Sequence, residues 1–126
     1  MTTHNPNLTI AVTGEYYMDF ADPAVEQICV ANWGDGFGIT YSSADSINRY
    51  LERNVFSGNT QITSFDEFKY FKFSGLAWNY WGNGPFTNCS NLETITIPSY
   101  VTTIVHGMFN GCSKLETCKD FNGDAV

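Results

Sequence analysis

The sequence predicts an α+β domain in which a small helical N-terminal cap leads into a short solenoid of short strands. Three observations support this fold class: a ten-residue motif recurs 23 residues later, stretches with helical apolar spacing precede it, and the chain is rich in aromatic residues. Aromatic side chains favour half-buried strands over long helices. We therefore expect a single domain over residues 1–126, with the cap in residues 1–85 and the repeats in residues 86–126.

The first element expected is a hairpin, and the second is a helix. Residues 8–12 alternate apolar and polar side chains, Thr13-Gly14 supplies a turn, and residues 16–18 follow it. Asp22 and Pro23 then place an N-cap and a first-turn proline at the start of a helix over about residues 23–32. One face of that helix is mostly apolar and comprises Val25, Ile28, Cys29 and Asn32.

Two shorter helices are expected to complete the cap. Ser42 or Ser43 can cap a helix that runs to about Glu52. Its inward side chains would be Ile47, Tyr50 and Leu51. The segment from Ser64 to Glu67 has the spacing of a capping box and predicts a short third helix. Its inward side chains would be Phe65, Phe68 and either Tyr70 or Phe71. Such a cap would cover the apolar face that the first coil of a solenoid otherwise exposes.

A glycine-rich segment between the first two expected helices invites comparison with a calcium loop. If Asn32 is the first loop position, the third and fifth positions are Gly34 and Gly36, and the twelfth is Ser43. Only one side-chain oxygen ligand is then certain, and the bidentate acid is missing. We therefore favour a simple interhelix turn around Asp35, and we expect no metal and no cofactor.

The repeat itself occupies residues 86–118. The segment from Phe86 to Ile95 aligns with the segment from Phe109 to Cys118, and six of the ten positions are identical. Within the first copy, Leu92, Ile95 and Ile97 follow the L-x-x-I-x-I spacing of the strand in a leucine-rich solenoid. The phenylalanines that begin the two copies are expected to fill the interior from the opposite side of each coil.

The four cysteines leave two alternatives open. An even number of cysteines in a small chain allows two disulfides, with three connectivities. The repeat accounts for Cys89 and Cys112 without a bond, because equivalent positions of adjacent coils would stack as small buried apolar side chains. No cysteine pair has the spacing of a zinc site.

The full pattern, F-x-x-C-x-x-L-x-x-I-x-I-P-x-x-V-T-x-I, resembles the BspA-type leucine-rich repeat of bacterial surface and secreted proteins. Residues 20–75 are similar, more patchily, to the segment that leads into such repeats in gut Bacteroidetes proteins. The resemblance implies an N-terminal cap with one to two repeats, and an extracellular or cell-surface location. The family usually has Ile-Gly before an Ala-Phe pair, whereas here Gly107 is displaced and His106 occupies a turn position. The N-terminus shows no signal peptide.

Candidate binding residues fall into two groups. Trp78, Tyr80 and Trp81 lie in a segment rich in glycine and asparagine, where they could cover the solenoid edge as core, contact a protein or form a platform for a sugar ring. The second group consists of residues expected on the exposed surface of the repeats: Glu93, Thr94, Thr96 and Lys114.

Composition and charge exclude several classes of partner. Six basic against thirteen acidic residues give a net charge of −7, which is too little positive charge for a nucleic-acid or anionic-membrane surface. No apolar run is long enough to cross a membrane. We expect neither nucleic-acid binding nor membrane insertion.

Catalysis is not expected either. His106 is six residues from Cys112, but no third group is in evidence to orient a Cys–His pair. We therefore expect a non-enzymatic interaction or adhesion module that presents a solenoid surface to a protein or glycan partner. The alternative is a structural piece of a cell surface or virion that forms a homo-oligomer through its open solenoid end.

Overall fold

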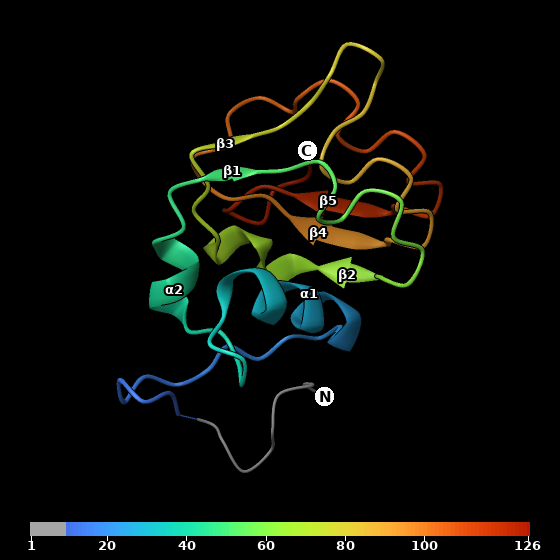
Figure 1. The fold of residues 1–126 in the computed structure, drawn as a ribbon. Helices are drawn as coiled ribbons and strands as arrows, with labels where there is room; N and C mark the ends of the chain where they lie inside the picture. Colours follow the sequence, from blue (N-terminus) through green and yellow to red (C-terminus); the bar gives the residue numbers. More distant parts are fainter. Residues whose placement is uncertain (1–9) are drawn as a thin grey trace.

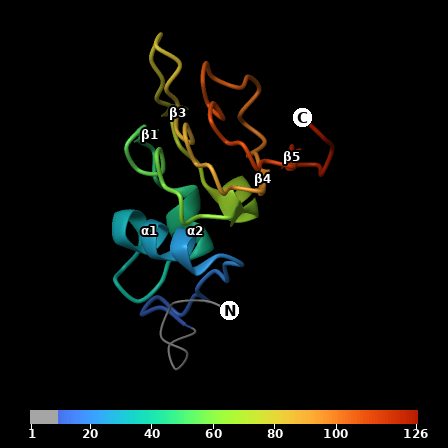
Figure 2. The same ribbon diagram turned by 90° about the vertical axis from the view of Figure 1, so that its right-hand side faces the viewer.

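The computed structural model describes residues 10–126 and contains three short helices and five short strands within that range (Figure 1). In chain order the elements are α1 (Pro23–Trp33), α2 (Tyr41–Asp45), β1 (Tyr50–Leu51), β2 (Ser64–Phe65), the 3₁₀ helix η1 (Asp66–Tyr70), β3 (Gly75–Leu76), β4 (Thr94–Thr96) and β5 (Thr117–Lys119). Helices α1 and α2 gather at one end of the molecule, and the strands and their long connections lie beyond them (Figure 2).

All the strand pairs are parallel, which fits segments joined by long crossover connections. Strands β2, β4 and β5 form one sheet in that order, and β1 pairs with β3 in a second one. The register pairs Thr94 with Thr117 and Ile95 with Cys118. The two copies of the sequence motif therefore lie side by side, at the 23-residue offset that the sequence shows.

A further copy of the repeat precedes these two. Strand β2 pairs with β4 so that Phe65 is level with Ile95, an offset of 30 residues. At the same offset Phe56 stacks on Phe86, with ring centroids 5.3 Å apart and an interplanar angle of 27°. The segment from Phe56 to Phe65 thus occupies the place of a repeat, although it was expected to belong to the cap.

The predicted capping box at Ser64–Glu67 is wrong. Ser64 is the first residue of strand β2, and η1 begins only at Asp66. The residue at the N-cap of η1 is Phe65, which makes no side-chain capping hydrogen bond. The pairing of β2 with β4 buries Phe65 completely, and this tertiary gain outweighs a local helix-start signal.

The first predicted helix is confirmed as α1, and its N-cap residue, Asp22, also holds a second segment of the chain. Asp22 Oδ1 accepts a hydrogen bond from the amide of Ala24 at 2.9 Å. The second carboxylate oxygen of Asp22 accepts from the amide of Thr63 at 2.6 Å. One aspartate therefore fixes the start of α1 and the approach to β2.

The second predicted helix is much shorter than expected. Helix α2 is capped by Thr40, whose hydroxyl oxygen accepts from the amide of Ser43 at 3.1 Å, and it ends at Asp45. Asn48 has a φ of 53°, a left-handed conformation that ends helical structure, and the chain then enters β1. The predicted cap at Ser42 or Ser43 and the helix to Glu52 are therefore wrong.

The predicted hairpin appears as a single antiparallel bridge between Ile10 and Tyr16, closed by a bond from the Gly14 amide to the Ala11 carbonyl at 2.9 Å. Leu8, which the hairpin prediction included, lies outside the described residues.

The core is built from phenylalanine rings. Six of them are fully buried: Phe20, Phe56, Phe65, Phe68, Phe71 and Phe86. The stack of Phe56 on Phe86 continues to Phe109, whose centroid lies 5.9 Å from that of Phe86. Trp33 joins helix α1 to this core through edge-on contacts with Phe71 and Phe73 at 5.7 and 5.1 Å. The expectation that Phe86 and Phe109 fill the interior is confirmed, although Phe109 is only partly buried.

Across residues 10–126, no helix has the length and apolar character that a membrane crossing requires.

Candidate functional site

The aromatic loop, residues 78–81, stands out from the body of the molecule (Figure 1). Trp78 is 41% exposed, and Tyr80 and Trp81 are each 86% exposed. The alternative that these side chains cover the solenoid edge as core is therefore wrong. Exposed aromatic side chains of this size are the groups that most often anchor a binding partner.

The loop is a defined turn, because Asn79 organises its backbone. The amide of Asn79 donates to the carbonyl of Asn83 at 2.9 Å, and Asn79 Oδ1 accepts from the amide of Trp81 at 3.0 Å. Gly82 takes a φ of 87°, which a side chain would disfavour. Trp78 packs edge-on against Tyr80, with centroids 5.0 Å apart.

The base of the loop docks on the equivalent turn of the next repeat. Gly107 approaches Gly82 so closely that a Cβ at Gly107 would overlap the Gly82 carbonyl. The hydroxyl of Thr87 accepts from the amide of Gly84 at 2.6 Å and donates to the carbonyl of Gly107 at 2.7 Å. The ring of His106 lies 6.1 Å from Trp78. The departure from the family pattern at His106 and Gly107 thus sits directly beneath the aromatic loop.

The two threonines of β4 contact a neighbouring element instead of facing solvent. The hydroxyls of Thr94 and Thr96 donate to the two carboxylate oxygens of Asp66, at 3.1 and 3.0 Å. Thr96 is buried and Thr94 is half-buried, so the expectation that Thr96 lies on the exposed surface is wrong. Asp66 lies in the first turn of η1, and these bonds fasten η1 to the strand.

Glu93 and Lys114 are exposed, as expected. Glu93 directly precedes β4 and Lys114 lies three residues before β5, and both strands lie in the body of the molecule (Figure 1). The aromatic loop projects away from that body, so these residues do not form one site with it (Figure 1). The structure therefore separates the predicted binding residues into an aromatic group and a repeat-surface group.

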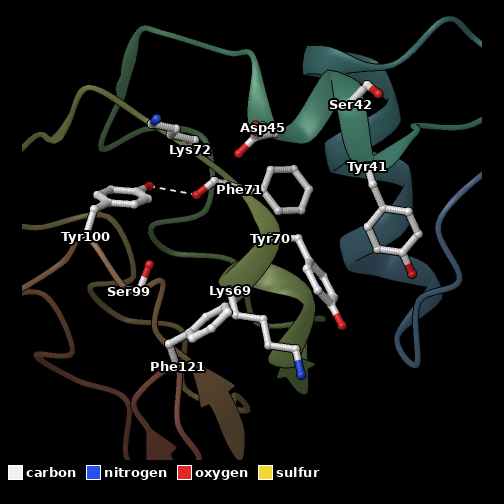
Figure 3. A pocket seen from close by; sticks show the side chains of 10 residues that line it. All are labelled: Tyr41, Ser42, Asp45, Lys69, Tyr70, Phe71, Lys72, Ser99, Tyr100 and Phe121. Atoms are coloured by element: carbon white, nitrogen blue, oxygen red, sulfur yellow. Dashed lines mark hydrogen bonds between the residues drawn. The ribbon is translucent and has the colours of Figure 1, made fainter.

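A second feature, which we call the tyrosine cavity, was not predicted from the sequence. It has a volume of about 590 Å³ and lies between α2, the segment from Lys69 to Lys72, and residues Ser99, Tyr100 and Phe121 (Figure 3). Its walls include the partly exposed rings of Tyr41, Tyr70, Tyr100 and Phe121. Two of the six basic residues of the chain, Lys69 and Lys72, flank Tyr70 and also line it. The two lysines on either side of Tyr70 and Phe71 were the feature of the sequence that could have indicated this cavity.

None of the thiols has the low pKa of a nucleophile. Burial raises the pKa of Cys89 to about 12 and also raises the pKa values of Cys29, Cys112 and Cys118. Cys89 and Cys112 donate to the carbonyls of Phe56 and Phe86, at 3.1 and 3.0 Å. All four cysteines are free, so the open alternative of two disulfides is not realised.

In the glycine-rich segment, the carboxylate of Asp35 is engaged in hydrogen bonds within the protein. Asp35 accepts from the amides of Phe37 and Gly38 at 2.9 and 3.1 Å, and from the hydroxyl of Tyr17 at 2.5 Å. Burial opposes ionisation of Asp35, but these hydrogen bonds outweigh it and lower its pKa. Among residues 10–126 no three His, Cys, Asp or Glu side chains are grouped as metal ligands would be.

Parallel strands stacked in register, phenylalanines stacked at repeat offsets and crossover connections define a repeat protein. More specifically, the chain belongs to the BspA-type leucine-rich repeat family. The family profile, described as "BspA type Leucine rich repeat region (6 copies)", matches residues 37–122. The match begins well before Phe86 and includes the additional copy at Phe56. No curated protein and no solved structure gives a significant match.

Leucine-rich repeat domains of this kind are generally non-enzymatic protein-interaction modules, and the family is typically found on surface or secreted proteins.

Proposed function

We propose that this chain is a short solenoid that acts as an adhesion module of a surface or secreted repeat protein, with a protein partner held by the aromatic loop. The observation that carries this proposal is the exposure of Trp78, Tyr80 and Trp81 on one turn. Repeat stacking supplies a rigid base, and the bonds of Asn79 hold the turn in one shape.

The energetics favour this loop over the rest of the surface. Burying one aromatic side chain in an interface stabilises the complex by about 1.5–3 kcal/mol, and aromatic anchors are the residues whose truncation most weakens binding. Because the turn is already ordered by its own hydrogen bonds, less conformational entropy is lost when a partner binds. Charged Glu93 and Lys114 would contribute mainly to orientation and association rate.

The test is a binding screen of the whole chain against immobilised extracellular proteins at physiological salt. We expect the Trp78→Ala/Trp81→Ala variant to lose at least about tenfold in affinity for any protein that the wild type binds. Tyr16→Ala is the matched control, because Tyr16 is also an exposed aromatic residue, 68% exposed. It belongs to the bridge with Ile10, in the segment before α1 that lies at the other end of the molecule from the loop (Figure 1). Equal binding by a folded double variant, or an equal loss in the control, would contradict the proposal.

A second candidate function is supported by the C-terminal end of the stack. Phe109, Cys112, Leu115 and Cys118 are only partly buried, whereas the equivalent Phe86, Cys89, Leu92 and Ile95 are completely buried. The last repeat therefore presents an apolar end face that a coil of another chain could cover. This favours a structural role in which copies of the chain associate end to end.

A further inference from the structure

We propose that the tyrosine cavity binds acidic oligosaccharides, with the carboxylate of a sugar ring held by lysines and the sugar ring packed on the tyrosine walls. The proposal goes beyond the function proposed above, because it concerns a different surface and a different class of ligand.

The walls of the cavity suit a pyranose ring. Tyr41 and Tyr70 meet edge-on, with centroids 5.0 Å apart and an interplanar angle of 90°. Tyr100 and Phe121 stand across from them (Figure 3). A sugar ring has an apolar face of C–H groups, which packs on an aromatic ring, and a rim of hydroxyls, which needs polar partners nearby. The volume of about 590 Å³ lies in the ~300–1,000 Å³ range that is typical of small-ligand sites.

One wall is fixed before any ligand arrives. The hydroxyl of Tyr100 donates to the carbonyl of Phe71 at 2.7 Å and accepts from the amide of Phe73 at 2.8 Å (Figure 3). The opposite side is also anchored, because the amide of Lys72 donates to the carbonyl of Ala44 at 2.9 Å and so ties the chain just after η1 to α2. A preformed site of this kind loses little conformational entropy on binding.

Charge gives the cavity its preference for an acid. Lys69 and Lys72 line it together with Asp45. A neighbouring cavity of about 560 Å³ shares Lys69 and Phe121 and adds Lys119 and Asp66. The carboxylate of Asp66 already accepts hydrogen bonds from Thr94 and Thr96.

The two cavities thus gather three of the chain's six basic residues against two aspartates, a local charge of +1 on a chain of net charge −7. Because the two cavities share Lys69 and Phe121, we place successive rings of a sugar chain with one carboxylate per ring in them. A dense polyanion is disfavoured, because the overall negative charge of the molecule would repel it.

The experiment is a titration of the full chain with unesterified tetragalacturonic acid, followed by amide NMR shifts and calorimetry. The matched ligand is the same tetrasaccharide with its carboxylates methyl-esterified, which keeps the rings and removes the charge. We expect the acidic form to bind and to shift amides around Tyr70 and Tyr100, and the ester to bind about tenfold more weakly.

Three variants locate the site. Lys69→Gln and Lys72→Gln should each weaken binding of the acid by about threefold, whereas Arg53→Gln, which removes an exposed positive charge outside both cavities, should leave it unchanged. The Trp78→Ala/Trp81→Ala variant should bind the acid as the wild type does, so this proposal and the aromatic-loop proposal can fail separately.

Three results would overturn the proposal. The first is an absence of shifts in the folded wild type at millimolar acid. The second is an equal loss of affinity in Arg53→Gln, which would indicate general charge attraction. The third is a loss confined to the tryptophan variant, which would place the sugar on the aromatic loop.

Discussion

Glu67 holds a carboxylate oxygen, Oε1, that is buried without a hydrogen-bond partner, and it is the only side-chain oxygen or nitrogen of the described residues in that position. Its other oxygen accepts from the amide of Ala21 at 3.1 Å. Burial is the main cause that raises the pKa of Glu67, and the negative charges of Asp66 and Asp22 add to it. The ionised form of Glu67 therefore works against folding.

We predict that Glu67→Gln increases the free energy of unfolding at pH 7 by on the order of 1 kcal/mol, after allowance for solvent screening. Because the folded pKa is raised, the folded chain holds this proton more tightly than the unfolded chain. The stabilising contribution of the protonated group is complete below the usual pKa of 4.5 and is lost as pH rises through the folded pKa.

Urea unfolding at several pH values checks this prediction. The gap between variant and wild type should be largest near neutral pH and should close near pH 4. A gap that stays constant with pH would show that Glu67 acts by packing and not by charge. Glu93→Gln is the control, because Glu93 is exposed to solvent and the substitution removes the same charge without relieving a buried carboxylate oxygen.

At the scale of elements, the contact between the turn at Gly82 and the turn at Gly107 holds the aromatic loop in position. Gly107, with a φ of 72°, lies against Gly82 at the base of the loop. We predict that Gly107→Ala lowers the free energy of unfolding by about 3 kcal/mol, because the new methyl group adds a steric clash to the strain of a left-handed backbone. Tryptophan fluorescence should shift as well, since the loop must move.

Gly123→Ala is the matched control for that substitution. Gly123 also has a left-handed φ, 87°, but open space surrounds the position where a Cβ would lie. It should therefore cost only about 1 kcal/mol, with unchanged tryptophan fluorescence. Equal costs for the two substitutions would contradict the role given to the turn contact.

The elements differ in how far the sequence could predict them. The copies at Phe86 and Phe109 share identical residues at one offset, so their pairing was predictable. The copy at Phe56 was missed because its offset from the next copy is 30 residues, not 23, and because few of its residues are identical. Similar apolar residues replace those of the later copy at most inward positions, and Asn59 stands at the place of Cys89. The capping-box motif that begins at Ser64 was misleading, because the pairing of β2 with β4 places Ser64 in a strand.

The candidate sites show the same limit. The residue types of the aromatic loop were visible in the sequence, but their exposure depends on where the turn docks. The tyrosine cavity brings Tyr41 and Phe121 together from segments 80 residues apart in the chain, and no local pattern encodes such a meeting. Thr96 was expected to be exposed because strand alternation places it on the face opposite Ile95 and Ile97. The alternation does not reveal that Asp66 covers that face.

For the molecule as a whole, the apolar end face determines whether the chain is monomeric or associates with other copies. If copies associate end to end, the sedimentation coefficient of the wild type should rise with concentration up to about 50 μM. Leu115→Asp should abolish that rise, because it places a charge among Phe109, Cys112 and Cys118. Ser113→Asp, an exposed neighbour with the same added charge, should leave it intact.

A wild type that sediments as a monomer across that range would exclude end-to-end association. It would leave the aromatic-loop and tyrosine-cavity proposals unaffected, because neither surface depends on a second copy.

The cysteine–carbonyl bonds between neighbouring repeats have a consequence for durability. Oxidants and alkylating agents attack the thiolate, and burial keeps Cys89 and Cys112 protonated. These sulfurs should therefore react slowly even where the surroundings are oxidising. A repeat array fastened by protonated thiols needs no disulfide-forming enzymes to mature, and it can be lengthened by one repeat at a time without pairing each new cysteine.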